Sequence, residues 1–152
     1  MLADNIERDT MDNIQQGILR DWKVVVVDDD LRSLDIACSL LKHYGAQVYQ
    51  AANGEEGVKL ASEHLPDLVI TDISMPIMDG WELIRRLKGE RATLDIPIIA
   101  LTAHAMPGHR TRAIAAGCHN YLTKPLTPYT FIKDLLILLV DIPSLAIRLQ
   151  TT

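Results

Sequence analysis

The chain has 152 residues, of which 48% are hydrophobic and 23% are charged, and it carries a formal net charge of −5. This length and apolar share suffice for one globular domain with a sizeable core, and the acidic balance argues against a non-specific grip on nucleic acid. There is no signal-peptide pattern, no apolar window long enough to span a membrane, and no cysteine pair at metal or disulfide spacing. We therefore predict a cytoplasmic protein.

The chain divides into three parts by its hydrophobic pattern. Residues 1–21 are polar, and we expect them to form an N-terminal extension outside the core. From residue 22 to residue 140, short apolar runs alternate with segments of helical periodicity, which predicts one domain. Residues 141–152 are left as a C-terminal tail.

Strands and helices are predicted to alternate along that domain. The predicted strands are 23–28, 46–51, 66–72, 96–102 and 119–123. The predicted helices begin after Asp30 and after Asn53, cover 81–90 and 106–116, and end with one that starts at Thr127 and Pro128. Five strand–helix units in a row predict an α/β fold, a doubly wound parallel sheet of five strands with five helices on both faces.

Polar residues stand at the carboxyl ends of several predicted strands, where open α/β sheets bind ligands. Asp28 and Asp29 end the first strand, Asp72 the third and Thr102 the fourth, and the fifth runs into Lys124. If the first and third strands are neighbours, three carboxylates meet and need a positive partner. Lys124 supplies one charge, and an all-oxygen set favours Mg²⁺ as the other.

This set of groups suits a metal-assisted phosphoryl transfer. A carboxylate can attack phosphorus and form an acyl phosphate, and Asp72 is the expected acceptor. The remaining requirement is to neutralise charge on the equatorial oxygens, which Mg²⁺, Lys124 and the Thr102 hydroxyl can do. Asp30 is more simply interpreted as the N-cap of the following helix.

Four stretches resemble the receiver domain of two-component response regulators, which has the CheY-like fold. They are VVVVDDD, DLVITDISMPIMDGWELI, IPIIALTAHA and GCHNYLTKPL, and the resemblance covers about residues 22–140. It implies a flavodoxin-like sheet with strand order 2-1-3-4-5. It also implies a protein that accepts a phosphoryl group from a histidine kinase or a histidine phosphotransfer protein, with Mg²⁺ as cofactor.

The resemblance also assigns roles to individual residues. Asp72 matches the phosphoacceptor, and Asp28, Asp29 and the backbone carbonyl of Ser74 match the metal ligands, together with Asp72 itself. Thr102 and Lys124 match the groups that hold the phosphoryl oxygens, Tyr121 matches the aromatic switch residue, and the Lys124–Pro125 bond is expected to be cis. Because Ser74 and His104 offer no carboxylate or amide to orient water, we expect slow self-dephosphorylation.

The function expected from this resemblance is a switch in protein–protein contacts, not an enzyme activity on another substrate. After the last helix only DIPSLAIRLQTT remains, so we expect no DNA-binding output domain and a target bound through the fourth helix, fifth strand and fifth helix. A stand-alone regulator is the favoured interpretation. The alternative is a receiver domain excised from a hybrid histidine kinase.

Three rival functions are disfavoured by particular residues. A phosphohydrolase would need a second acid two residues after the nucleophile, where Ser74 stands. A flavin-binding module would need a phosphate loop after the first strand, where the chain has three acids. A receiver without phosphorylation chemistry would not need the complete set of acids with Thr102 and Lys124.

The last predicted helix is more apolar than one covered face requires. Leu136, Ile137, Leu139 and Val140 extend around it beyond a single stripe. Two hypotheses account for the excess. Either Leu145, Ile147 and Leu149 of the tail fold back over it, or the helix contributes to a homodimer surface.

Overall fold

The structure is a computed structural model that describes residues 14–75, 77–103, 108–128 and 130–150. Its centre is a sheet of five parallel strands in the order β2-β1-β3-β4-β5. The strands are β1 (Lys23–Val27), β2 (Gln47–Ala51), β3 (Leu68–Asp72), β4 (Ile98–Thr102) and β5 (Asn120–Thr123). The predicted fold class and strand order are therefore confirmed, with β2 and β5 at the two edges.

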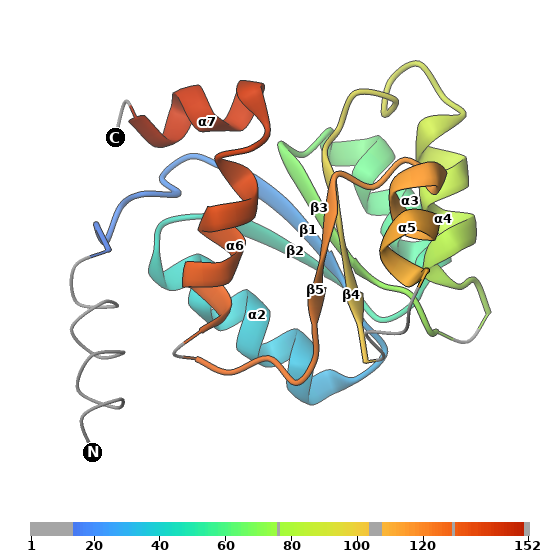
Figure 1. Cartoon of the computed structure of the whole chain (residues 1–152), viewed down its shortest axis with the longest axis horizontal. Coiled ribbons are helices and arrows are strands. Elements are labelled where there is room, and N and C mark those ends of the chain that lie inside the picture. Colours follow the sequence, from blue (N-terminus) through green and yellow to red (C-terminus); the bar gives the residue numbers. More distant parts are fainter. Residues whose placement is uncertain (1–13, 76, 104–107, 129, 151–152) are drawn as a thin grey trace.

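Helices cover both faces of the sheet (Figure 1). They are α2 (Leu31–His43), α3 (Gly54–His64), α4 (Gly80–Lys88), α5 (His109–Ala116), α6 (Phe131–Leu139) and α7 (Pro143–Gln150). The helices α2 and α6 pack on one face, and α3, α4 and α5 pack on the other. The prediction of five helices is one too few for the described residues, because the tail folds into α7.

The predicted helix starts are correct for α2 and α3 but wrong for α6. The Asp30 side chain accepts from Arg32 N, and the Asn53 side chain accepts from Glu56 N, so both are N-caps. Helix α6, the last of the predicted helices, begins at Phe131 and not at Pro128. The Thr127 hydroxyl is engaged with the Thr130 hydroxyl instead of capping a helix, and the backbone N–H groups of Thr130 and Phe131 both donate to Thr127 O.

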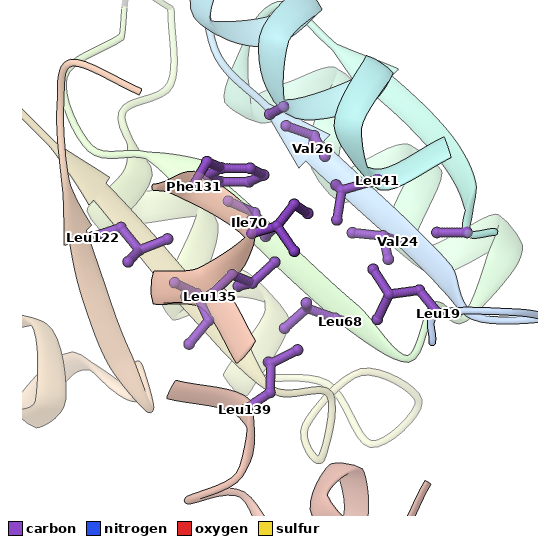
Figure 2. Packing of buried hydrophobic residues seen from close by; sticks show 14 of the residues in the cluster. Leu19, Val24, Val26, Leu41, Leu68, Ile70, Leu122, Phe131, Leu135 and Leu139 are labelled. Atoms are coloured by element: carbon purple, nitrogen blue, oxygen red, sulfur yellow. The ribbon is translucent and has the colours of Figure 1, made fainter. Parts of the chain in front are cut away.

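The four valines of β1 explain how the sheet holds two cores together. Val24 and Val26 point into the cluster beneath α2 and α6, and Val25 and Val27 point into the cluster beneath α3, α4 and α5. All four are fully buried. Figure 2 shows Val24 and Val26 beside Leu41, Ile70 and Leu135. The unbroken β-branched run is therefore that of a strand covered on both faces.

The prediction that residues 1–21 lie outside the core is wrong for the part of this segment that the structure describes. Leu19 is 1% exposed and belongs to the same cluster as Leu41. Its backbone N–H donates to Tyr44 O over 3.0 Å, and Ile14 and Ile18 pack against the cluster. Residues 1–13 lie outside the described residues. The core thus extends before the predicted start of the domain.

The tail packs against the same cluster, beside the N-terminal segment (Figure 1). Leu145 of α7 is 3% exposed, and Leu149 packs against the cluster. The Arg148 guanidinium lies 2.7 Å from an Asp67 carboxylate oxygen and 4.7 Å from the centre of the Trp22 ring. The fold-back hypothesis is thus confirmed for Leu145 and Leu149.

Part of the apolar excess remains exposed. Ile147 of the tail is 64% exposed, and Ile137 of α6 and the C-cap residue Val140 are each 55% exposed. The fold-back hypothesis is therefore wrong for Ile147. The homodimer stays a prediction.

Replacing Leu145 by alanine should lower the free energy of unfolding by about 2–4 kcal/mol, because it removes a buried side chain and leaves a cavity. Ile147→Ala, on the same short helix but at an exposed position, should change it by less than about 0.5 kcal/mol. Urea unfolding of both variants measures the difference. Equal effects would show that α7 does not pack as described.

Cys38 and Cys118 are free and buried, and burial raises the pKa of their thiols to about 11 and about 12. Each therefore packs as a small apolar side chain.

In the described ranges, no helix combines the length and the apolar character needed to cross a bilayer.

Candidate functional site

Three carboxylates meet at the carboxyl edge of the sheet. Asp28 and Asp29 directly follow β1, Asp72 ends β3, and these two strands are paired neighbours. Asp28 is fully buried and Asp72 is 5% exposed, whereas Asp29 faces solvent. One oxygen from each carboxylate lies within 4.8 Å of the others. The cluster predicted from the strand ends is therefore present.

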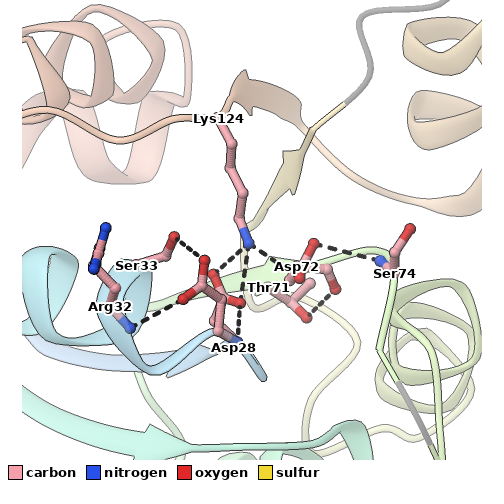
Figure 3. Close-up of polar contacts among 8 residues, drawn as sticks. Asp28, Arg32, Ser33, Thr71, Asp72, Ser74 and Lys124 are labelled. Carbon is pink, nitrogen blue, oxygen red and sulfur yellow. Dashed lines mark hydrogen bonds and ion pairs between the residues drawn. The ribbon is translucent and has the colours of Figure 1, made fainter.

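Lys124 reaches this cluster from the end of β5 (Figure 3). Its Nζ lies 2.8 Å from Asp28 Oδ2 and 3.0 Å from Asp28 Oδ1, and it donates to Asp72 Oδ2 over 3.1 Å. The Lys124 backbone N–H donates to Thr102 O over 2.8 Å, which fixes the start of its side chain beside β4. The Lys124–Pro125 bond is cis, as the resemblance implied.

The charges of the cluster are only partly balanced. Burial raises the pKa of Asp72, and the charge of Asp28 raises it further against the opposing effect of Lys124. Burial and a hydrogen bond with Asp72 raise the pKa of Asp29. Burial lowers the pKa of Lys124, but Asp28 and Asp72 outweigh burial and hold that pKa above its ordinary value. A single ammonium group thus offsets only part of the negative charge of three carboxylates, and the site favours a further positive charge.

The hydrogen bonding of the Asp28 carboxylate shows that a cation would fit beside it. Its Oδ1 accepts from Asp30 N over 2.9 Å. Its Oδ2 is buried and accepts no hydrogen bond of normal geometry from the described residues, although it lies in ion-pair contact with Lys124. A buried carboxylate oxygen without a hydrogen bond, beside two other carboxylates, suits a hard divalent cation such as Mg²⁺.

The other predicted site residues lie on the same edge. The Ser74 backbone N–H donates to Asp72 Oδ1 over 3.4 Å, and the predicted metal contact of its carbonyl stays a prediction. Thr102 is buried at the end of β4, next to β3. Tyr121 is half-buried on β5, opposite Ala100. His104 lies outside the described residues.

Gly80 is a site residue that the sequence argument missed. Its N–H donates to Ile73 O over 2.8 Å, and a Cβ at this position would come within 2.3 Å of Asp72 O. Only glycine therefore lets the first turn of α4 pack directly on the backbone of Asp72. The sequence does contain an indication of this role. Asp79 is the N-cap of α4, so the Asp79–Gly80 pair before an amphipathic run marks Gly80 as the first residue of the helix.

Neutralising Asp29 should stabilise the protein when no divalent cation is bound. Its folded-state pKa is raised, so its charge is unfavourable above that pKa and costs nothing below the unfolded value near pH 4. Asp29→Asn should therefore raise the melting temperature at pH 7 by about 1–3 °C, and the gain should vanish at low pH.

Asp30→Asn is the matched control, because hydrogen bonds from Arg32 and Ser33 lower the pKa of Asp30. Its charge is favourable, so neutralising it should not stabilise. Thermal denaturation with a chelator, at pH 7 and at low pH, makes the comparison. A lower melting temperature for Asp29→Asn at pH 7 would contradict the prediction.

Comparisons with known proteins agree with this geometry. The family model described as "Response regulator receiver domain" matches residues 24–136, a range that includes every carboxylate of the cluster and Lys124. The polar-differentiation response regulator DivK of Brucella anthropi is 35% identical over 112 residues, which are 74% of this chain and 91% of that protein. Hybrid signal transduction histidine kinase G of Dictyostelium discoideum is 40% identical over 121 residues, covering 76% of this chain and 3% of the kinase.

A solved structure gives the same result for the fold. The chemotaxis response regulator CheY4 of Vibrio cholerae superposes with a TM-score of 0.73 at 30% sequence identity. The superposition covers 78% of this chain and 99% of that protein. The similarity thus extends over the whole of the smaller structure, and the parts of this chain beyond it are additions to the shared fold.

Proposed function

This chain belongs to the response regulator receiver domain family, and on that basis we propose that it is a phosphorylation-dependent switch in which Asp72 is the phosphoacceptor. The observation that carries the proposal is the convergence of Asp28, Asp29, Asp72 and Lys124 at one edge of the sheet. The donor is a histidine kinase or a histidine phosphotransfer protein. We place this exchange in the cytoplasm.

The proposed reaction is a transfer between two protein side chains. An Asp72 carboxylate oxygen attacks phosphorus, the new O–P bond forms, and the P–N bond of the donor phosphohistidine breaks with its electron pair returning to the imidazole. Lys124, already 3.1 Å from Asp72, neutralises charge on one phosphoryl oxygen, and the Thr102 hydroxyl donates to another.

The carboxylates of Asp28, Asp29 and Asp72, with the Ser74 carbonyl, would hold Mg²⁺, which supplies positive charge for the phosphoryl oxygens. The protein has no other substrate in this proposal, and so it is not an enzyme in the usual sense. Since Ser74 presents no acid or amide to an attacking water, the acyl phosphate is expected to be long-lived.

The output is a change in protein contacts through α5, β5 and α6. Tyr121 is the switch residue of this surface, and it lines a groove between β5 and α6 together with Leu126, Phe131 and Ile137. A groove with both apolar and charged lining, including Asp134, suits a protein segment.

A second candidate context is a receiver domain within a hybrid histidine kinase. The match to 3% of the Dictyostelium kinase favours it, because a chain of this kind occurs inside a much larger protein there. The phosphoacceptor chemistry proposed for Asp72 is the same in both contexts.

Incubation with Mg²⁺ and acetyl phosphate should add the mass of one acid-labile phosphoryl group, and Asp72→Asn should abolish it. Asp30→Asn, which changes the acid beside the metal pair but keeps a good N-cap, should still be phosphorylated. Addition of a chelator should stop the uptake. Intact-protein mass spectrometry gives the readout, and either an unmodified wild-type protein or a labelled Asp72→Asn variant would overturn the proposal.

A further inference from the structure

The helix α5 is held to its neighbours mainly by small side chains. Among the α5 side chains that the structure describes, Ala113 is the one that is buried, and Ala116 is partly buried. The adjacent α4 buries Leu83, Ile84 and Leu87 in the same cluster. With so little apolar surface to separate, α5 should move at a lower cost than α4.

One larger contact joins α5 to α4. The Arg112 guanidinium carbon lies 4.2 Å from the centre of the Trp81 ring, within the range of a cation–π interaction. Trp81 is half-buried and belongs to the cluster beneath α4, only nine residues after Asp72. Arg112 itself is exposed, so its side chain can leave the ring without removing a buried side chain from the core.

The same tryptophan borders a small cavity beside the proposed switch. Its lining residues are Ile73, Trp81, Ala100, Thr102, Ala113 and Tyr121. Tyr121 also lines the groove between β5 and α6, so it borders both spaces. Ala113, the residue next to Arg112, lines the cavity on the α5 side.

These contacts couple the position of Tyr121 to the position of α5. If the Tyr121 ring turns inward toward Thr102, it must enter a cavity that is too small unless the wall at Ala113 moves outward. Because Arg112 precedes Ala113 on α5, that displacement carries Arg112 away from the Trp81 ring. The stacked and unstacked arrangements therefore correspond to two positions of the helix.

We propose that the Arg112–Trp81 contact is a latch that holds α5 in its resting position and opposes the inward rotation of Tyr121. Arg112 is a positioning residue in this proposal, since it touches neither the carboxylates nor the phosphoryl group. The proposal rests on the proposed function of Asp72 and adds what sets the resting equilibrium of the switch. Loss of this contact should shift the equilibrium toward the arrangement in which Tyr121 is turned inward and α5 is displaced.

The test measures the affinity for beryllofluoride, a phosphoryl mimic, by calorimetry in the presence of Mg²⁺. Arg112→Ala should bind it about two- to fivefold more tightly than the wild-type protein, as expected for loss of one exposed cation–π contact that favours the resting state. Arg112→Lys, which keeps a cation over the ring, should lie close to wild type. Arg86→Ala removes an exposed arginine of α4 that has no ring contact among the described residues, and it should change nothing.

A double-mutant cycle separates the latch from a general loosening of the fold. Trp81→Leu should tighten binding as Arg112→Ala does, and Arg112→Ala added to Trp81→Leu should have no further effect. Equal affinity of wild type and Arg112→Ala, or additive effects of the two changes, would overturn the latch. A wild-type protein that takes up no phosphoryl group from acetyl phosphate would overturn the proposed function first, and the latch with it.

Discussion

Replacing Lys124 by alanine is expected to lower the free energy of unfolding by about 3 kcal/mol when no divalent cation is present. The Lys124 ammonium contacts both Asp28 and Asp72, and the three side chains are almost completely buried. Removing the ammonium leaves two buried carboxylates without a counter-charge, which costs more than the pair itself contributes. Added Mg²⁺ should restore part of the loss, because it supplies positive charge at the same acids.

Urea unfolding with and without Mg²⁺ measures this effect, and Lys133→Ala on the exposed side of α6 is the control. The control should shift the free energy of unfolding by less than about 0.5 kcal/mol.

The loss of stability in Lys124→Ala should shrink as the pH falls through the raised pKa of Asp72, since a protonated acid needs no counter-charge. Phosphorylation by acetyl phosphate should slow about 100-fold. An unchanged unfolding midpoint would contradict the buried ion pairs.

Replacing Gly80 by alanine should damage both stability and phosphorylation. The added Cβ would lie 2.3 Å from Asp72 O and 2.7 Å from Ile73 Cα, and both of these are backbone atoms that cannot swing aside. We expect a loss of about 2–3 kcal/mol, the usual cost of forcing extra volume into a packed site. The backbone of Asp72 must shift, so the rate of phosphoryl uptake should fall as well.

Gly89→Ala is the matched control at the other end of the same helix. Gly89 is the C-cap of α4 with φ −84°, an ordinary value, and its added Cβ would come no closer than 3.2 Å to a carbonyl oxygen. Its effect on unfolding should be small, and phosphorylation should proceed at the wild-type rate. If Gly80→Ala unfolds at the same urea concentration as Gly89→Ala, α4 does not rest on Asp72 as described.

The sheet and the acidic cluster were predictable because each follows from a local pattern and one rule of topology. Alternating apolar runs and helical periodicity locate the elements, and parallel strands bring their carboxyl ends to one edge. Asp28, Asp72 and Lys124 met where that rule placed them. Their roles in phosphoryl transfer are a proposal that the experiments above test.

The features that the sequence argument missed depend on contacts between distant segments. The helix α7 has only eight residues, and Leu145 becomes a core residue only because it packs into a cluster built by other elements. Gly80 matters through the approach of two backbones, which residue type alone does not reveal. The contact of Arg112 with Trp81 joins two helices, and neither spacing nor composition indicates it.

The two-sided burial of β1 gives the molecule a direction for passing a signal. Because its valines belong to both cores, any displacement of Asp28 would disturb packing above and below the sheet at once. The edge strand β5 is different: Asn120 and Tyr121 are only half-buried, and its neighbour α5 is lightly anchored. Packing therefore restrains β1 more tightly than it restrains β5. A conformational change that starts at Asp72 is therefore expected to displace β5 and α5 more than β1.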